Sequence, residues 1–174
     1  MNRTILFACL FVAVIWGGNV EGADDQVPPS CNTTASNGIG ILGNSEPGSY
    51  GNGLMSVGQW RDGTVIFRPG GPGFVTSDGG LGMKFGWRRG VRGRLIVTGR
   101  RLDTPALPLR ARVPQGYGDF GFQSTYLIFS TPGCWEVTGR VGDTSLTFVT
   151  NVVKIGGGPT WRLDPEGVDP RPAQ

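Results

Sequence analysis

Two neighbouring stretches decide the fold: Cys134-Trp-Glu-Val-Thr-Gly-Arg-Val141 and, after Gly142-Asp143-Thr144, Ser145-Leu-Thr-Phe-Val-Thr-Asn-Val-Val-Lys154. Trp135 and Val137 alternate with polar residues, which is the period-two pattern of a strand with one buried face. The Gly-Asp-Thr segment between the two runs is a turn signal. These residues therefore predict a β-hairpin near the end of the chain, with Trp135 in the core.

Further short apolar runs, separated by turn residues, fill the chain before this hairpin. They cover residues 54–60, 64–67, 83–87, 93–99 and 124–130. Glycine accounts for 31 of 174 residues and is scattered between the runs, which favours many tight turns. No stretch after the N-terminus keeps a helical period over three turns. About seven short strands with a turn signal every 8–12 residues or so predict an all-β, antiparallel β-sandwich.

Local signals inside these runs make further structural predictions. Asp62-Gly63 lies between the first two runs, and Asp-Gly between strands favours a hairpin. Trp60, Trp87 and Trp135 each lie in an alternating strand, so we expect all three in the core rather than on a sugar-binding platform. Tyr117 lies between two glycines, and we expect it to be exposed.

A family resemblance adds to this pattern. Pro132-Gly-Cys-Trp-Glu-Val-Thr-Gly-Arg-Val141 and Ser145-Leu-Thr-Phe-Val149 resemble the final hairpin of bacterial immunoglobulin-like domains. In those domains a Pro-Gly-x-aromatic-x-Val strand precedes an alternating last strand, and Trp135 takes the aromatic core position. The resemblance covers residues 54–155 and implies an immunoglobulin-like sandwich in a group of exported bacterial proteins without an assigned activity. Sandwiches of this kind serve many roles, so the resemblance implies a fold rather than a function.

The N-terminus has the features of a secretory signal peptide. Arg3 precedes an uncharged apolar run from 5 to 16, and small residues follow up to Gly22. The run is shorter than the roughly 20 residues that a membrane-spanning helix needs. We therefore predict a signal peptide over residues 1–22, a cut before Ala23, and a secreted or periplasmic mature chain without a transmembrane segment.

The mature chain divides by composition into three parts. Residues 23–53 are rich in Asn, Ser, Pro and Gly and predict an irregular N-terminal segment. Residues 54–155 carry the predicted sandwich. Residues 156–174 form a Gly/Pro-rich tail that we expect to be loosely ordered, with Trp161, its largest apolar side chain, able to fold back.

Two cysteines remain after removal of the signal peptide, in which Cys9 lies. Cys31 and Cys134 in an oxidising compartment favour a structural disulfide. The alternative, a redox or nucleophilic thiol, lacks both C-x-x-C spacing and a histidine partner.

Histidine is absent from the whole chain. This excludes Ser-His-Asp and Cys-His hydrolase sites and every histidine-bound zinc site. Carboxylates remain as candidate catalytic groups, but most of them lie in glycine-containing turns, where local hydrogen bonding explains them. They are Asp62, Asp78, Asp103, Asp119, Glu136 and Asp143. We therefore predict no catalytic residue, metal or cofactor, and keep a histidine-free hydrolase as the least favoured hypothesis.

The main concentration of charge lies between Lys84 and Arg112, where nine cations face the single anion Asp103. The candidate anion-binding residues are Arg88, Arg89, Arg92, Arg100, Arg101, Arg110 and Arg112. Guanidinium groups bind phosphate and carboxylate through two hydrogen bonds at once. An export signal favours an anionic glycan, lipid or envelope protein as partner and disfavours nucleic acid. The alternative is that these arginines are solvated charges on sheet faces and edges.

A site would require these arginines to converge. The pairs Arg88–Arg89 and Arg100–Arg101 flank a short strand, which separates them by about 20 Å. A real site would then be an elongated groove or would use one pair with Arg110 and Arg112. The sequence favours a non-catalytic binding or structural module of the bacterial cell envelope, with an arginine-dependent anion binder as the alternative.

Overall fold

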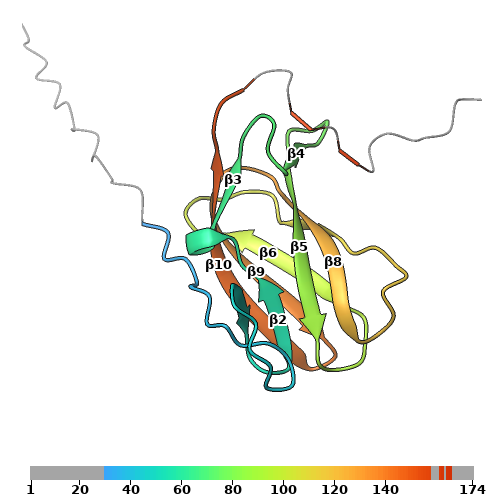
Figure 1. The fold of residues 1–174 in the computed structure, drawn as a ribbon. Helices are drawn as coiled ribbons and strands as arrows, with labels where there is room; N and C mark the ends of the chain where they lie inside the picture. The colour runs from blue at the N-terminus through green and yellow to red at the C-terminus, as the bar shows by residue number, and fades with distance from the viewer. Residues whose placement is uncertain (1–29, 158–160, 163, 166–174) are drawn as a thin grey trace, which may run out of the picture.

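The computed structural model describes residues 30–157, 161–162 and 164–165, which form two β-sheets packed face to face (Figure 1). The predicted all-β sandwich is confirmed. The predicted signal peptide, residues 1–22, lies outside the described residues. Within the described part of the chain, no helix is long and apolar enough to cross a membrane.

The two sheets contain ten strands, more than the seven or so that the sequence predicts. The first sheet has the order β1 (Ser49–Gly51), β2 (Met55–Gly58), β5 (Leu81–Arg89), β8 (Gly121–Phe129) and β7 (Arg110–Arg112), with β4 (Phe74–Val75) also paired to β5. The second sheet has the order β3 (Thr64–Phe67), β10 (Thr144–Lys154), β9 (Gly133–Val141) and β6 (Ile96–Arg101). All pairs are antiparallel except β3 with β10, which is parallel.

The hairpin predicted at the end of the chain is β9–β10. Trp135 lies opposite Thr150 and Val137 opposite Phe148 in its register. Trp135, Val137 and Phe148 are buried, so the period-two pattern marks the inner face correctly. A two-residue turn at Gly142–Asp143 joins the strands.

Aromatic rings from both sheets meet between them. Phe148 of β10 packs against Trp87 and Phe85 of β5, with ring centroids 5.9 and 6.0 Å apart. The Trp87 ring needs Gly139, because a Cβ at that position would lie 2.3 Å from the ring. Trp87 and Trp135 are fully buried and Trp60 is partly buried against the same cluster, in agreement with the sequence.

The predicted hairpin at Asp62-Gly63 is wrong. The strand before it, β2, pairs with β5 in the first sheet, whereas the strand after it, β3, pairs with β10 in the second. Asp62 and Gly63 do adopt the left-handed backbone that their sequence favours, with φ of 55° and 66°. The turn therefore carries the chain from one sheet to the other. A local turn signal fixes the backbone but not the strand partner.

The N-terminal segment is more ordered than its composition predicts. Strand β1 lies inside the range 23–53. At its free edge, the side-chain amide of Asn37 donates to the carbonyl of Gly51 and accepts a hydrogen bond from the Gly51 N–H. Thr34 exchanges hydrogen bonds with the backbone of Val149, in the part of β10 that is not paired with β3. The segment therefore covers two sheet edges that would otherwise expose unpaired backbone groups.

A disulfide joins this segment to the sandwich. The Sγ atoms of Cys31 and Cys134 lie 2.10 Å apart, and Cys134 is the second residue of β9. The described part of the C-terminal tail also contacts the domain. Trp161 is partly buried against the core, and the backbone of Arg162 forms an isolated parallel β-bridge with Phe74.

Candidate functional site

The seven arginines singled out by the sequence are dispersed over the sandwich. Arg88 lies on the outer face of the first sheet and Arg100 on the outer face of the second. Because the sheets pack through their inner faces, these side chains point to opposite sides of the molecule. The structure therefore does not bring the Arg88–Arg89 and Arg100–Arg101 pairs to one surface, and no single site contains all seven.

Six of the seven arginines form ion pairs, each with a different carboxylate. The pairs are Arg88–Glu46, Arg92–Asp119, Arg100–Glu136, Arg101–Asp103, Arg110–Asp78 and Arg112–Asp164. Arg92–Asp119 and Arg110–Asp78 are at least half exposed on both sides, and such pairs contribute little to stability. Arg101–Asp103 and Arg112–Asp164 are mostly buried. The main effect of the six pairs is on charge, because each pair cancels a cation that would otherwise attract an anionic ligand.

The same pairs hold several carboxylates in the ionised form. Hydrogen bonds from Thr76 and Arg110 lower the pKa of Asp78 to about 2. The Arg101 guanidinium lowers the pKa of Asp103. Partial burial raises the pKa of Glu46, but hydrogen bonds from Ser56 and Arg88 outweigh it, so the pKa is lowered overall. These carboxylates are poor proton donors at neutral pH.

Acid should weaken the protein through Asp78. Folding lowers the pKa of this carboxyl from 3.8 to about 2, so its stabilising contribution is complete above about pH 4 and is lost as the pH falls to about 2. Melting temperatures measured between pH 6 and pH 2 should fall over this window, and Asp78→Asn should reduce the fall. Identical profiles for the variant and the wild type would contradict the pairing with Thr76 and Arg110.

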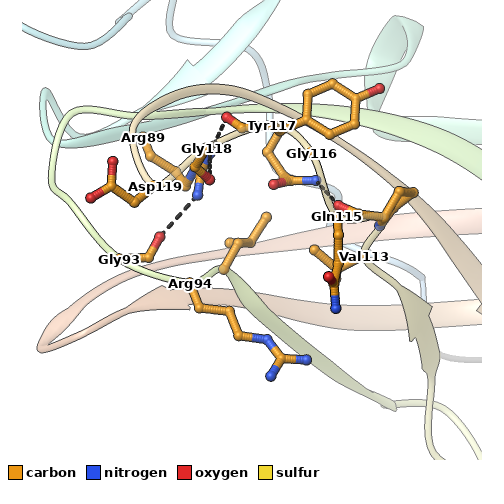
Figure 2. A pocket seen from close by; sticks show the side chains of 12 residues that line it. Arg89, Gly93, Arg94, Val113, Gln115, Gly116, Tyr117, Gly118 and Asp119 are labelled. Carbon is orange, nitrogen blue, oxygen red and sulfur yellow. Dashed lines mark hydrogen bonds between the residues drawn. The ribbon is translucent and has the colours of Figure 1, made fainter.

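Arg89 differs from the other six because it has no carboxylate partner among the described residues. Its side chain is only 1% exposed. Nη1 donates to the carbonyl oxygen of Gly93 at 2.9 Å, and Nη2 donates to those of Gly118 at 3.1 Å and Tyr117 at 3.3 Å. Nε donates more weakly to the carbonyl of Gly121 at 3.4 Å. Arg89 therefore ties the β5–β6 loop, residues 90–95, to the β7–β8 loop, residues 113–120 (Figure 2).

These two loops enclose an open cleft of about 480 Å³ at one end of the sandwich. Arg89 lines it together with Arg94, Leu95, Gln115, Tyr117 and Asp119. In Figure 2 the side chains of Arg94 and Tyr117 extend from opposite sides of the cleft. Arg94 is exposed and has no partner in the described part of the chain. Sequence reasoning omitted Arg94 from the candidate site, although it belongs to the same charged region.

Exposed aromatic rings lie next to this cleft. Tyr117, Phe120 and Phe122 are 37%, 42% and 45% exposed, and the sequence prediction that Tyr117 is exposed is confirmed. The rings of Tyr117 and Phe122 meet edge to face, with centroids 5.8 Å apart. The guanidinium groups of Arg88 and Arg92 lie over Phe122 and Phe120, each 5.9 Å from the ring centroid. We call Tyr117, Phe120 and Phe122 the aromatic patch.

Metal ligands do not gather anywhere in the described ranges: no group of three or more His, Cys, Asp or Glu residues could hold an ion there. No protein-family model matches the chain, and no curated protein matches it. The geometry of the loop end is therefore the main basis for assigning a function.

Replacing Arg89 should loosen the loop end. Arg89→Met keeps most of the buried volume but leaves up to four carbonyl oxygens without their donor, and we expect a loss of about 2–4 kcal/mol in the free energy of unfolding. Chemical denaturation measures this loss. Arg100→Met, on the outer face of the second sheet, is the control and should cost less than about 0.5 kcal/mol. Equal stabilities for the two variants would contradict the role of Arg89 as the link between the loops.

Proposed function

We propose that this protein is an exported immunoglobulin-like sandwich that acts as a non-catalytic binding module of the bacterial cell envelope, with its ligand site in the loop-end cleft. The strand order supports the immunoglobulin-like assignment. Immunoglobulin domains have the strand orders A-B-E-D and C-F-G in their two sheets. Here β2-β5-β8-β7 corresponds to the first order and β6-β9-β10 to the second, with β3 added beside β10.

The cleft is the observation that carries the binding function. Its volume of about 480 Å³ is typical of small-molecule sites, which measure roughly 300–1,000 Å³. It lies between two loops on a rigid sandwich, and binding residues are often carried by loops on such scaffolds. Arg89 links both loops to β5, so the cleft is preorganised and binding would not require ordering of the loops.

The ion pairs favour binding over catalysis. A carboxylate that acts as a general acid needs a raised pKa, whereas Asp78, Asp103 and Glu46 have lowered values. None of these three lines the loop-end cleft. Asp119, which does line it, is already bound to Arg92 at 2.9 Å.

Export has two supports. The charged start and the apolar run of residues 5–16 are typical of a signal peptide. The Cys31–Cys134 disulfide fits an oxidising compartment outside the cytoplasm. The resemblance of the final hairpin to bacterial immunoglobulin-like domains is what points to the bacterial envelope.

Co-sedimentation tests the proposed function. Purified oxidised protein is mixed with insoluble peptidoglycan and, separately, with vesicles of outer-membrane lipid, and the pellet and the released reducing sugars are measured. We expect the protein in at least one pellet and no release of sugar. A variant with the cleft altered, Tyr117→Ala/Gln115→Ala, should remain in the supernatant, whereas Ile66→Ala, an exposed change on β3, should behave as wild type. Release of sugar would support the hydrolase, and absence from both pellets would contradict an envelope-binding role.

A further inference from the structure

We infer that the loop-end cleft binds an acidic saccharide, with the anionic group held by Arg94 beside the buried charge of Arg89 and a sugar ring stacked on the aromatic patch. This inference rests on the proposed function and names the ligand class for the same cleft. Three properties of the described residues carry it: the charge balance at the cleft, the fixed position of Arg89, and the aromatic rings beside it.

The charge balance favours an anion. Of the four arginines near the loop end, Arg88 and Arg92 are neutralised by Glu46 and Asp119. Arg89 is bound only by backbone carbonyls, and Arg94 has no partner among the described residues. Two uncompensated cations therefore line one cleft. No carboxylate in the described part of the chain balances them, so an anionic ligand group would supply the missing charge.

Arg89 makes this positive charge permanent and fixed. An arginine side chain stays protonated at every physiological pH. Because Arg89 is only 1% exposed, water screens its charge less than it screens a charge at the surface. A guanidinium has five N–H groups, and the four carbonyl contacts leave one N–H of Nη1 without an acceptor in the described residues. Arg94 supplies the exposed fork that can bind a carboxylate or phosphate through two hydrogen bonds.

The aromatic patch favours a sugar as the carrier of the anionic group. Tyr117 belongs both to the cleft lining and to the patch. The faces of aromatic rings carry partial negative charge and attract the polarised C–H groups on the flat side of a sugar ring. Tyr117 and Phe122 meet edge to face, so one exposed ring can stack on a sugar while the other holds it in place. The cleft volume of about 480 Å³ suits one or two sugar units.

Calorimetric titration at 50 and 500 mM salt tests the inference with three tetrasaccharide-sized probes: an oligogalacturonate, a phosphorylated oligosaccharide and a neutral chito-oligosaccharide. The two acidic probes separate a carboxylate from a phosphate as the recognised anion. We expect at least one of them to bind at least about tenfold more tightly than the neutral probe at low salt, and to lose most of this advantage at high salt.

Matched variants locate the contact. Arg94→Gln keeps a polar side chain but removes the charge and the guanidinium fork, so it should weaken binding of the acidic probe about tenfold, with unchanged melting temperature. Arg100→Gln, also exposed but on the outer face of the second sheet, should bind as wild type. Tyr117→Ala should weaken the binding of acidic and neutral probes to the same degree.

If neutral and acidic probes bind equally, or if Arg94→Gln binds with wild-type affinity, the ligand is not recognised through an anionic group. The cleft would still be a binding site. No binding of any probe, with co-sedimentation retained, would overturn the acidic saccharide as the ligand and point to another component of the pelleted material, such as the stem peptides of peptidoglycan or the lipid headgroups. If the protein neither binds a probe nor co-sediments, the proposed function itself is contradicted.

Discussion

Trp135→Ala should lower the free energy of unfolding by about 3–5 kcal/mol, because it removes a large buried ring and leaves a cavity. Trp135 is fully buried in β9, where its ring packs edge to face against Phe129 of the opposite sheet, with centroids 5.5 Å apart. Its Nε1 also donates to the carbonyl of Thr131 at 3.1 Å. The substitution therefore removes a contact between the sheets and a hydrogen bond between β9 and the turn that precedes it.

Urea denaturation of the oxidised protein measures this loss. Ile66→Ala, which truncates an exposed apolar side chain on β3, is the control and should change stability by less than about 0.5 kcal/mol. An unchanged unfolding midpoint for a soluble Trp135→Ala protein would mean that the register of β9 and β10 is wrong, and with it the packing of the two sheets.

Removing the disulfide should cost a similar amount. Cys31 and Cys134 are 103 residues apart in the sequence, and the loop-closure model assigns about 4–5 kcal/mol to a crosslink of that span. For a chain of this size, such a loss corresponds to a fall in melting temperature on the order of 10 °C or more. We expect this difference between the oxidised protein and the Cys31→Ser/Cys134→Ser variant.

The disulfide also anchors the segment that covers β10. In the variant, the amide of Val149 should exchange with solvent faster, because it is bound by the Thr34 hydroxyl in the anchored segment. The amide of Val137, inside the β9–β10 hairpin, is the internal control. Its exchange should become faster only as far as the lower free energy of global unfolding of the variant requires. Equal melting temperatures and equal exchange at Val149 would contradict a structural role for the bond.

The final hairpin was predictable because its information is local. Trp135, Val137 and Val141 of β9 lie on one face and the turn between the strands is short, so the buried face and the partner strand both follow from neighbouring residues. Trp135 and Val137 therefore lie where the sequence places them. The same reasoning fails at Asp62-Gly63, where Asp-Gly predicts a turn but does not reveal that the chain switches sheets there. Strand partners far apart in the sequence, such as β3 and β10, leave no local signal.

The candidate site was only partly predictable for the same reason. The sequence located the arginine-rich region but not the acids that neutralise it, because partners such as Glu46 and Arg88 are 42 residues apart. The period-two pattern of Met83, Phe85 and Trp87 places Arg89 on the same inward face, which is a signal that it is buried. Nothing local indicates that its partners are the carbonyls of Tyr117 and Gly118. The cleft exists only once the two loops meet.

Amide NMR spectra of ¹⁵N-labelled protein, recorded while the acidic tetrasaccharide is added, test most directly whether the loop end is the binding surface. Chemical-shift changes should concentrate in residues 90–95 and 113–120, with those of Arg94 and Tyr117 among the largest. They should saturate together, and Arg94→Gln should need about ten times more ligand to reach the same changes. Changes that instead concentrate on the outer face of β6 and β9, around Thr98 and Thr138, with the two loops unaffected, would contradict binding in the loop-end cleft.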